Sequence, residues 1–211
     1  MQEQPGDQRK QQKRGEKTTR RVLDAARRLI AKGGFDAAQL SQVSRESGVS
    51  TGSLYHHFGS KEGIFTRLIE EFADQAVADL QALDLAELDF DARLRRLLDL
   101  TCAQFRNNPE LYRSMSERVK AMPDIWVPLR ELRKEFETRM RAELSDSLRA
   151  RGVAEPDAAI HRMMQVVLGL LTHSVVFSSG PVSVEEPTLE NQIFTIGYAI
   201  ILLPTCAKEL P

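Results

Sequence analysis

Apolar residues recur at helical spacing along almost the whole chain, and this feature constrains the fold more than any other. Val22, Ala25, Ala26, Leu29 and Ile30 fall at positions i, i+3, i+4, i+7 and i+8, which is the apolar stripe of an amphipathic helix. The same spacing returns in the later segments, and no stretch shows the alternation with period two that a strand requires. The sequence therefore predicts an all-α fold of about nine helices.

Two short helices separated by a glycine turn are expected within residues 39–58. The first covers residues 39–47, Gly48 and Val49 form the turn, and Ser50 is placed to cap a second helix over residues 51–58. A longer helix should start after Ser60. Helix, turn and short helix at this spacing are typical of a helix-turn-helix DNA-binding motif, whose second helix enters the major groove.

The second short helix carries side chains that suit contact with DNA. Ser50, Thr51 and Ser53 place hydroxyls at the helix start, where free backbone N–H groups favour phosphate, and Gly52 permits close approach. Tyr55, His56 and His57 add ring area and hydrogen-bonding tips. Lys61 lies in the first turn of the next helix, where the helix dipole disfavours a cation, so we expect a phosphate partner. The candidate DNA-binding residues are Ser50, Thr51, Gly52, Ser53, Tyr55, His56, His57 and Lys61.

Other interpretations of these residues stay open at this point. Tyr55 could pack in the core, and His56 and His57 could be solvated or could bind a metal. Metal binding by the pair is disfavoured because adjacent helical residues point about 100° apart. The two cysteines, Cys102 and Cys206, lie near no cluster of metal ligands, so we expect no metal, no cofactor and no disulfide framework.

The formal net charge of -1 conceals a division of charge along the chain. Residues 1–67 hold thirteen Lys and Arg against seven Asp and Glu, which gives +6, whereas residues 68–211 carry -7. A basic module is thus joined to an acidic one. We expect a flexible basic arm over residues 1–15, either solvated or touching DNA, a DNA-binding domain over 16–63, and a ligand-binding and dimerisation domain over 64–211.

The residues from Gly48 to Phe65 read GVSTGSLYHHFGSKEGIF, and the helix over 18–30 and the pair Gly34 and Phe35 precede them. With these features, residues 18–72 resemble the N-terminal domain of the tetracycline-repressor (TetR) family. The resemblance implies a homodimeric transcriptional regulator, usually a repressor, whose C-terminal helices form a dimer interface and an effector pocket. The positions that match the family's DNA contacts are Ser50, Thr51, Ser53, Tyr55, His56, His57 and Lys61.

One departure from the family pattern concerns the first helix of the motif. Many members have a Thr that caps this helix, whereas residues 38–41 here read AQLS. Which of Gln39, Ser41 and Gln42 contacts DNA is therefore left open.

Two helices near the C-terminus, over residues 157–177 and 188–203, are apolar on all sides. Such helices must be covered by other elements, and pairing with the same helices of a second subunit would form a four-helix bundle. The expected dimer interface comprises Val166, Gly169, Leu170, Gly197 and Ile200. Residues 163–184 and 191–207 lack charged side chains, but polar residues interrupt both, and neither reaches the roughly 20 apolar residues of a membrane span. The N-terminus has no secretory signal pattern, so we expect a cytoplasmic protein without a membrane partner.

A pocket for a small, mostly apolar effector is expected among the C-terminal helices, although simple core packing would give the same pattern. The candidate lining residues are Thr101, Phe105, Met115, Trp126, Met164, Thr172, His173, Phe177, Phe194 and Tyr198.

The leading hypothesis is a homodimeric repressor that an effector releases from a pseudo-palindromic double-stranded DNA operator. One rival is a family member without an effector. A helical-bundle enzyme is the other rival, but the sequence has no nucleophile elbow, glycine-rich phosphate loop, Glu-x-x-His pair or Cys/His cluster, so we predict no catalytic residues.

Overall fold

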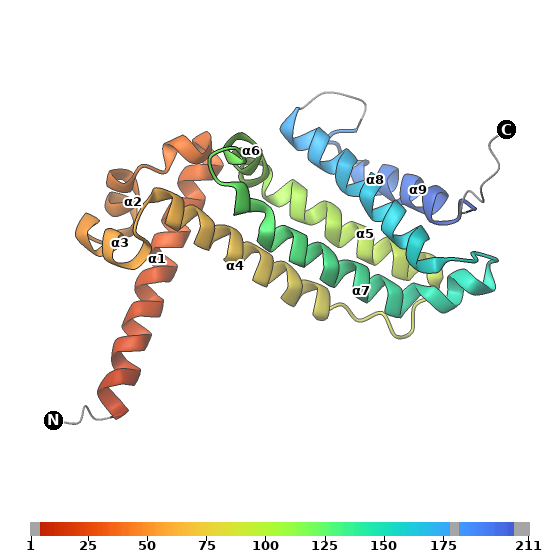
Figure 1. The fold of residues 1–211 in the computed structure, drawn as a ribbon, viewed down its shortest axis with the longest axis horizontal. Coiled ribbons are helices and arrows are strands. Elements are labelled where there is room, and N and C mark those ends of the chain that lie inside the picture. Colours follow the sequence, from red (N-terminus) through yellow and green to blue (C-terminus); the bar gives the residue numbers. More distant parts are fainter. Residues whose placement is uncertain (1–4, 178–181, 205–211) are drawn as a thin grey trace. The chain divides into compact units, whose positions relative to one another are not determined.

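The computed structural model describes residues 5–177 and 182–204, with side chains from Gly15 onward; Cys206 lies outside these ranges. The described residues form nine α-helices and one short 3-10 helix, and they contain no strand. This confirms the all-α prediction. The chain divides into two compact units, residues 1–72 and 73–211, which Figure 1 shows as one ribbon coloured along the sequence.

The first unit contains α1 (Pro5–Ala37), α2 (Leu40–Ser47), α3 (Thr51–Phe58) and the start of α4 (Lys61–Gln81). The backbone leaves helical geometry at Gly33 and Gly34, so α1 breaks where the glycine pair predicts a helix end. The helix begins at Pro5, which differs from the flexible arm expected over 1–15. Gln, Lys, Arg and Glu have good helix propensity, and a lack of apolar periodicity does not remove it. The boundary expected at residue 63 falls inside α4, because this helix is continuous across both units.

The core of the first unit is built from one face of each helix. Phe35 follows the α1 break and packs edge-on against Phe65 of α4, with ring centroids 4.9 Å apart. Other apolar side chains of this unit are buried as well, namely Val22, Leu23, Leu29, Ile30, Val43, Leu54, Ile64, Leu68 and Ile69. α2 and α3 are thereby held by their inner faces, and their outer faces are free to carry polar groups.

The second unit is a bundle. It contains the end of α4, then α5 (Phe90–Asn107), α6 (Pro109–Arg118), the 3-10 helix η1 (Pro123–Trp126), α7 (Val127–Ala150), α8 (Pro156–Val176) and α9 (Leu189–Ile201). Figure 1 shows α5, α7, α8 and α9 side by side, and α8 contacts α5, α6, α7 and α9. Asp89 caps α5 by accepting a hydrogen bond from the Ala92 amide at 2.8 Å.

α8 is long and apolar enough to cross a membrane by length and composition, and no other helix in the described ranges passes that test. A core helix of a bundle has the same composition. Ile160, Met163, Val167 and Leu171 of α8 have no exposed surface, because they face the neighbouring helices.

Arg106 of α5 fixes the segment that leads into α9. Its Nε donates to the carbonyl of Val184 at 3.0 Å, and its Nη2 donates to the carbonyl of Glu186 at 2.9 Å. The carboxylate of Glu190 accepts a further hydrogen bond from Nη2 at 3.0 Å. Arg106 thus supplies hydrogen-bond donors to two backbone carbonyls of a segment that has no regular secondary structure.

Candidate nucleic-acid interface and small-molecule cavity

The turn between α2 and α3 is rigid. Gly48 has a φ of +65°, which favours glycine, and a Cβ there would lie 2.7 Å from Nη2 of Arg21. Arg21 donates from this atom to the carbonyl of Ser47, and Ser44 Oγ donates to the carbonyl of Val49 at 2.7 Å. These bonds fix the direction in which α3 leaves the turn.

α3 has a polar outer face and is held to the core by a buried side chain on its inner face. Ser50 is the N-cap as predicted, because its Oγ accepts a hydrogen bond from the Ser53 amide at 3.2 Å. Leu54 points inward and is 1% exposed. Tyr55 is 54% exposed, so the interpretation of this residue as core packing is wrong. Thr51, Gly52, Tyr55, His56 and His57 are exposed, Ser53 and Phe58 are half-buried, and α3 has no acidic residue.

The two histidines of α3 lie side by side at the surface, with ring centroids 5.3 Å apart in an edge-on arrangement. Among the residues that the structure describes, no group of three His, Cys, Asp or Glu side chains is placed to hold a metal ion. The arrangement leaves both imidazoles able to donate or accept hydrogen bonds at the surface.

The junction between α3 and α4 depends on a glycine that the sequence analysis did not single out. Ser60 Oγ accepts a hydrogen bond from the Gly63 amide at 3.2 Å, which is the cap expected for α4. A Cβ on Gly63 would lie 1.9 Å from the carbonyl oxygen of Phe58. The C-terminal end of α3 therefore rests directly on the first turn of α4. Glycine is unusual inside a helix, so its presence at position 63 is the feature of the sequence that could have indicated this close contact.

Lys61 has partners within its own unit. Its Nζ lies 3.5 Å from Oδ1 of Asp36 and 4.0 Å from the centroid of the Phe35 ring, and its side chain is 13% exposed. An anion and an aromatic face offset the unfavourable position of the cation near the start of α4. A phosphate contact by Lys61 would therefore have to compete with Asp36.

The three residues left open at the start of α2 differ in their surroundings. Gln39 precedes α2 and donates from Nε2 to the carbonyl of Asp36 at 3.1 Å. The side-chain oxygen of Gln42 accepts a hydrogen bond from Arg45. Ser41 is exposed in the first turn of α2.

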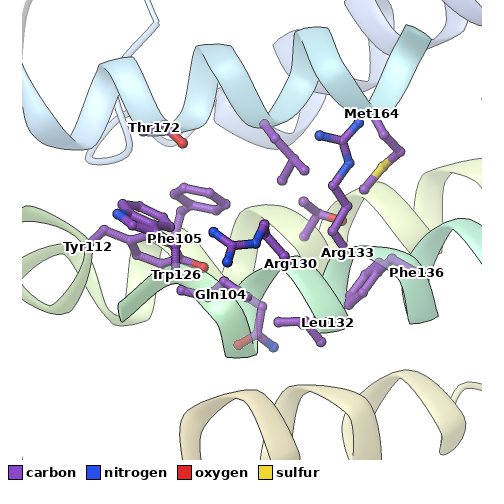
Figure 2. A pocket seen from close by; sticks show the side chains of 13 residues that line it. Gln104, Phe105, Tyr112, Trp126, Arg130, Leu132, Arg133, Phe136, Met164 and Thr172 are labelled. Carbon is purple, nitrogen blue, oxygen red and sulfur yellow. The ribbon is translucent and has the colours of Figure 1, made fainter. Parts of the chain in front are cut away.

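The second unit contains a cavity of about 210 Å³ between α5, α6, α7 and α8. Figure 2 shows its aromatic and charged side chains. It is lined by Thr101, Gln104, Phe105, Tyr112, Trp126, Leu129, Arg130, Leu132, Arg133, Phe136, Met164, Leu168 and Thr172. The candidate pocket residues that the structure brings together here are Thr101, Phe105, Trp126, Met164 and Thr172.

The other candidate pocket residues lie elsewhere. Met115 is a fully buried core residue, and Phe177, which directly follows α8, is 66% exposed beside His173, with ring centroids 5.1 Å apart. Tyr198 packs against Phe90 and Phe194, away from the cavity lining. On α8 the cavity residues follow a spacing of four, Met164, Leu168 and Thr172, so His173 and Phe177 project from a different face.

Several lining residues escaped the sequence analysis, most of them on α7. This helix is rich in charged residues, yet Leu129, Leu132, Arg133 and Phe136 repeat at spacings of three and four, which predicts a shared face. Gln104 is next to the expected Phe105 on α5, and Tyr112 on α6 stacks on Phe105 with centroids 4.1 Å apart and planes at 10°.

A buried carboxylate lies next to the cavity on α7. Glu137 is 8% exposed in its side chain, and its Oε1 accepts from Arg133 Nε at 2.8 Å and lies 3.2 Å from His161 Nδ1. Its Oε2 accepts from Arg141 at 3.2 Å. Burial acts to raise the pKa of Glu137, but the hydrogen bonds from Arg133 and His161 outweigh it and lower this pKa below 4.5. Glu137 is therefore ionised at neutral pH.

The residues expected at a dimer interface do not share one environment. Val166 and Gly169 are exposed on α8, and Leu170 and Ile200 are half-buried. Gly197 is buried, and a Cβ there would lie 2.8 Å from Cδ1 of Leu98. The assignment of Gly197 to an intersubunit surface is wrong, because this glycine permits the close approach of α9 to α5 in the same chain.

Comparison with known proteins relates the first unit to bacterial transcriptional regulators. Residues 22–68 match the family of bacterial regulatory proteins described as the tetR family. The HTH-type transcriptional repressor Rv1474c of Mycobacterium tuberculosis is 33% identical over 107 residues, which are 47% of this chain and 57% of that protein. This chain therefore spans little more than half the length of that relative.

Solved structures of other proteins are similar to this chain over a greater part of its length than the sequence match covers. A TetR-family transcriptional regulator from Mesorhizobium loti has a TM-score of 0.66 at 19% identity, over 89% of this chain and 96% of that one. The regulator FadR from Bacillus subtilis, solved in complex with stearoyl-CoA, has a TM-score of 0.55 at 15% identity, over 86% of this chain and 94% of that one. At these identities the likeness of the second unit is one of fold.

Proposed function

We propose that this chain, whose residues 22–68 match the tetR family of bacterial regulatory proteins, acts as a homodimeric repressor that binds a pseudo-palindromic operator. The observation that carries the proposal is the outer face of α3, on which Tyr55, His56 and His57 are exposed above the buried Leu54. Aromatic and imidazole side chains on a rigid helix can reach base edges in the major groove.

In this proposal the start of α3 contacts the DNA backbone. The capped N-terminus offers amide N–H groups, and Thr51 offers an exposed hydroxyl. Apart from the adjoining residues and backbone of α3 itself, no atom lies within 4 Å of the position that a Cβ on Gly52 would take. A phosphate could therefore approach the backbone there. These contacts would orient α3, and the side chains that follow would read the sequence.

Dimerisation would use the outer faces of α8 and α9. Val166 is 36% exposed and Phe177 is 66% exposed, and large apolar side chains gathered on one helix mark an interaction surface. A twofold axis through this surface would repeat the DNA-binding motif, and two motifs would contact successive major grooves roughly 34 Å apart.

The cavity in the second unit supports control by a small molecule. It has mostly apolar walls and a few polar groups, which is typical of ligand sites. The FadR structure from Bacillus subtilis, which is similar in fold, contains stearoyl-CoA, whose acyl chain is apolar, and we propose an effector of mostly apolar character for this chain. Such an effector would release DNA only if it bound the DNA-free conformation more tightly. We place the protein in the cytoplasm, where its DNA target lies.

The experiment is operator selection from a random DNA library, followed by titration of the selected duplex with wild-type protein and with Tyr55→Ala. We expect a palindromic consensus bound by two subunits, and a loss of at least about tenfold in affinity for Tyr55→Ala, which corresponds to one lost base contact. Sedimentation velocity on the free protein measures the dimer.

Arg67→Ala is the control, since Arg67 is exposed on α4 and pairs with Glu70. It should bind the selected duplex like the wild type. Failure to select any sequence, or equal affinity for Tyr55→Ala with unchanged folding, would contradict the proposal. If no small molecule releases the operator complex, the family member without an effector becomes the better description.

A further inference from the structure

We propose that the cavity in the second unit binds an amphipathic monocarboxylate, with its apolar body against the aromatic side chains and its carboxylate on Arg133 and Arg130. This inference rests on the proposed function, because it names the chemical class of the effector. It is carried by two observations, the composition of the lining and one unpaired nitrogen of Arg133.

The walls of the cavity select an apolar body. Phe105 and Tyr112 form a stacked pair with centroids 4.1 Å apart, and Trp126, Phe136 and Met164 add further apolar surface around the same space. Figure 2 shows Trp126 and Phe105 together at one side and Phe136 and Met164 at the other. A ligand between them would remove apolar surface from water on both sides.

The charges of the lining select an anion. Arg130 and Arg133 line the cavity, and no Asp or Glu is among the thirteen lining residues. Arg130 alone among these residues is exposed, so it marks the mouth, whereas Arg133 is half-buried farther along the same helix. Figure 2 shows Arg130 lying between the Phe105 and Trp126 side chains and Arg133. A carboxylate near both guanidinium groups would be favoured, and a cationic head group would be repelled.

The hydrogen bonds of Arg133 leave one nitrogen without an acceptor. Nε donates to Oε1 of Glu137 at 2.8 Å, and Nη1 donates to Oε1 of Gln165 at 3.0 Å. Nη2 is buried and has no hydrogen-bond partner among the described residues. Buried groups of this kind nearly always have a partner, and a guanidinium nitrogen can only donate. A ligand carboxylate oxygen would supply the acceptor.

Glu137 does not supply the missing negative charge. Its one carboxylate is shared by Arg133 and Arg141, and His161 lies against it as well. Arg141 also pairs with Asp157 at 3.7 Å, so its charge is balanced without Glu137. Arg133 has no carboxylate partner besides this shared Glu137, and Arg130 at the mouth has none among the described residues. A ligand anion would thus pair with two guanidinium groups that no carboxylate of the cavity lining neutralises.

The protein carries its own reporter for this site. Trp126 is the only tryptophan in the chain, and it lines the cavity. Binding in the cavity should change its fluorescence, whereas binding elsewhere should not. The probes are decanoate and naphthoate, and the neutral comparisons are decanol and naphthyl methanol, which keep the same apolar bodies.

We expect at least one of the two carboxylates to change the Trp126 fluorescence saturably, with an affinity at least tenfold above that of its neutral counterpart. Arg133→Gln should reduce the affinity for the carboxylate to that for the alcohol, and Arg130→Gln, an exposed change that should not affect folding, should reduce it partly. Arg149→Gln on the same helix is the control, because Arg149 is exposed and pairs with Asp146 outside the cavity.

Equal binding of carboxylate and alcohol would overturn the inference, and so would the absence of any fluorescence change with both carboxylates. An affinity that neither arginine variant changes would overturn it as well. These measurements contain no DNA, so their failure leaves the proposed function intact. Conversely, a protein that binds decanoate but selects no operator would disprove the proposed function alone.

Discussion

The surface of α3 and the cavity of the bundle differ in how they are assembled and in which direction their side chains face. α3 is eight residues long, is anchored by Leu54, and presents its polar groups outward from one contiguous stretch of sequence. The cavity is assembled from side chains of α5, α6, α7 and α8, with η1 contributing Trp126, and its apolar groups face inward. The α3 surface can be recognised from local sequence, whereas the cavity exists only after segments that are distant in the sequence have packed together.

The two regions also differ in how tightly their atoms pack. At the α3 surface the backbone is fixed by close contacts with no spare room, as at Gly48 and Gly63. In the bundle the helices leave space that no side chain fills. Steric changes should therefore be severe at these close contacts and mild at the cavity, and four variants test this difference.

The largest effect is expected for Gly63→Ala. Its Cβ would lie 1.9 Å from the Phe58 carbonyl oxygen, so α3 and α4 could not keep their junction. We expect a loss of at least about 3 kcal/mol in the free energy of unfolding of the first unit, measured by chemical denaturation. Gly52→Ala is the matched control, because its Cβ would meet open space, and it should stabilise α3 by up to about 1 kcal/mol. Equal stability of the two variants would show that the α3–α4 junction is not rigid.

The next prediction compares the loss of stability when either of two leucines in the second unit is replaced by phenylalanine. Leu144 is fully buried and lies away from the cavity, so Leu144→Phe should cost about 1 to 3 kcal/mol of unfolding free energy through overpacking. Leu168 lines the cavity, and Leu168→Phe should cost less than about 1 kcal/mol because the ring can enter the empty space. Thermal unfolding measures both. If Leu168→Phe is the more damaging change, the cavity does not persist in solution.

A third pair of variants removes a carboxylate charge from each unit, beginning with the buried carboxylate of Glu137. Its folded pKa is lowered, so its contribution to stability is present above pH 4.5 and is lost as the pH falls through the folded pKa. Glu137→Gln should reduce the unfolding free energy by about 1 to 3 kcal/mol at pH 7, and the difference from wild type should shrink on acidification. Denaturant titrations at a series of pH values measure this.

Glu46→Gln is the counterpart in the first unit, where Glu46 pairs with Arg28 at 3.7 Å near the surface. It should cost less than about 1 kcal/mol. A difference between Glu137→Gln and wild type that stays constant down to pH 3 would contradict the ionised, hydrogen-bonded state of Glu137.

Much of the fold could be predicted from the sequence, because its signals are local. Glycines and caps mark the ends of α2 and α3, and the apolar spacing of α5 and α8 defines their buried faces. The break of α1 at Gly33 and Gly34 follows from the same reasoning. The helical state of residues 5–15 did not follow, because polar residues can form a helix without any apolar stripe.

The cavity was only partly predictable for a different reason. A helix that is apolar on all sides, such as α8, gives no indication of which face meets a cavity and which meets solvent or a partner. Phe177 and Met164 look alike in the sequence, yet the first is 66% exposed and the second is buried at the cavity. Gly197 was misassigned for the same reason, since a small residue suits any close helix contact.

The ion pairs of the first unit bear on how its positive charge acts in salt. Residues 15–67 contain nine Lys and Arg side chains, and six of these engage partners in their own unit, namely Arg21, Arg27, Arg28, Arg45, Lys61 and Arg67. Four of the six, Arg27, Arg28, Lys61 and Arg67, pair with carboxylates, whereas Arg21 and Arg45 donate to neutral oxygens. Cations that are already paired with carboxylates inside the protein release few counterions from a duplex. The slope of log affinity against log salt, about -0.9 for each phosphate contact, should therefore fall well below the value for thirteen cations per subunit. Recognition would depend less on ionic strength than the basic composition of this unit implies.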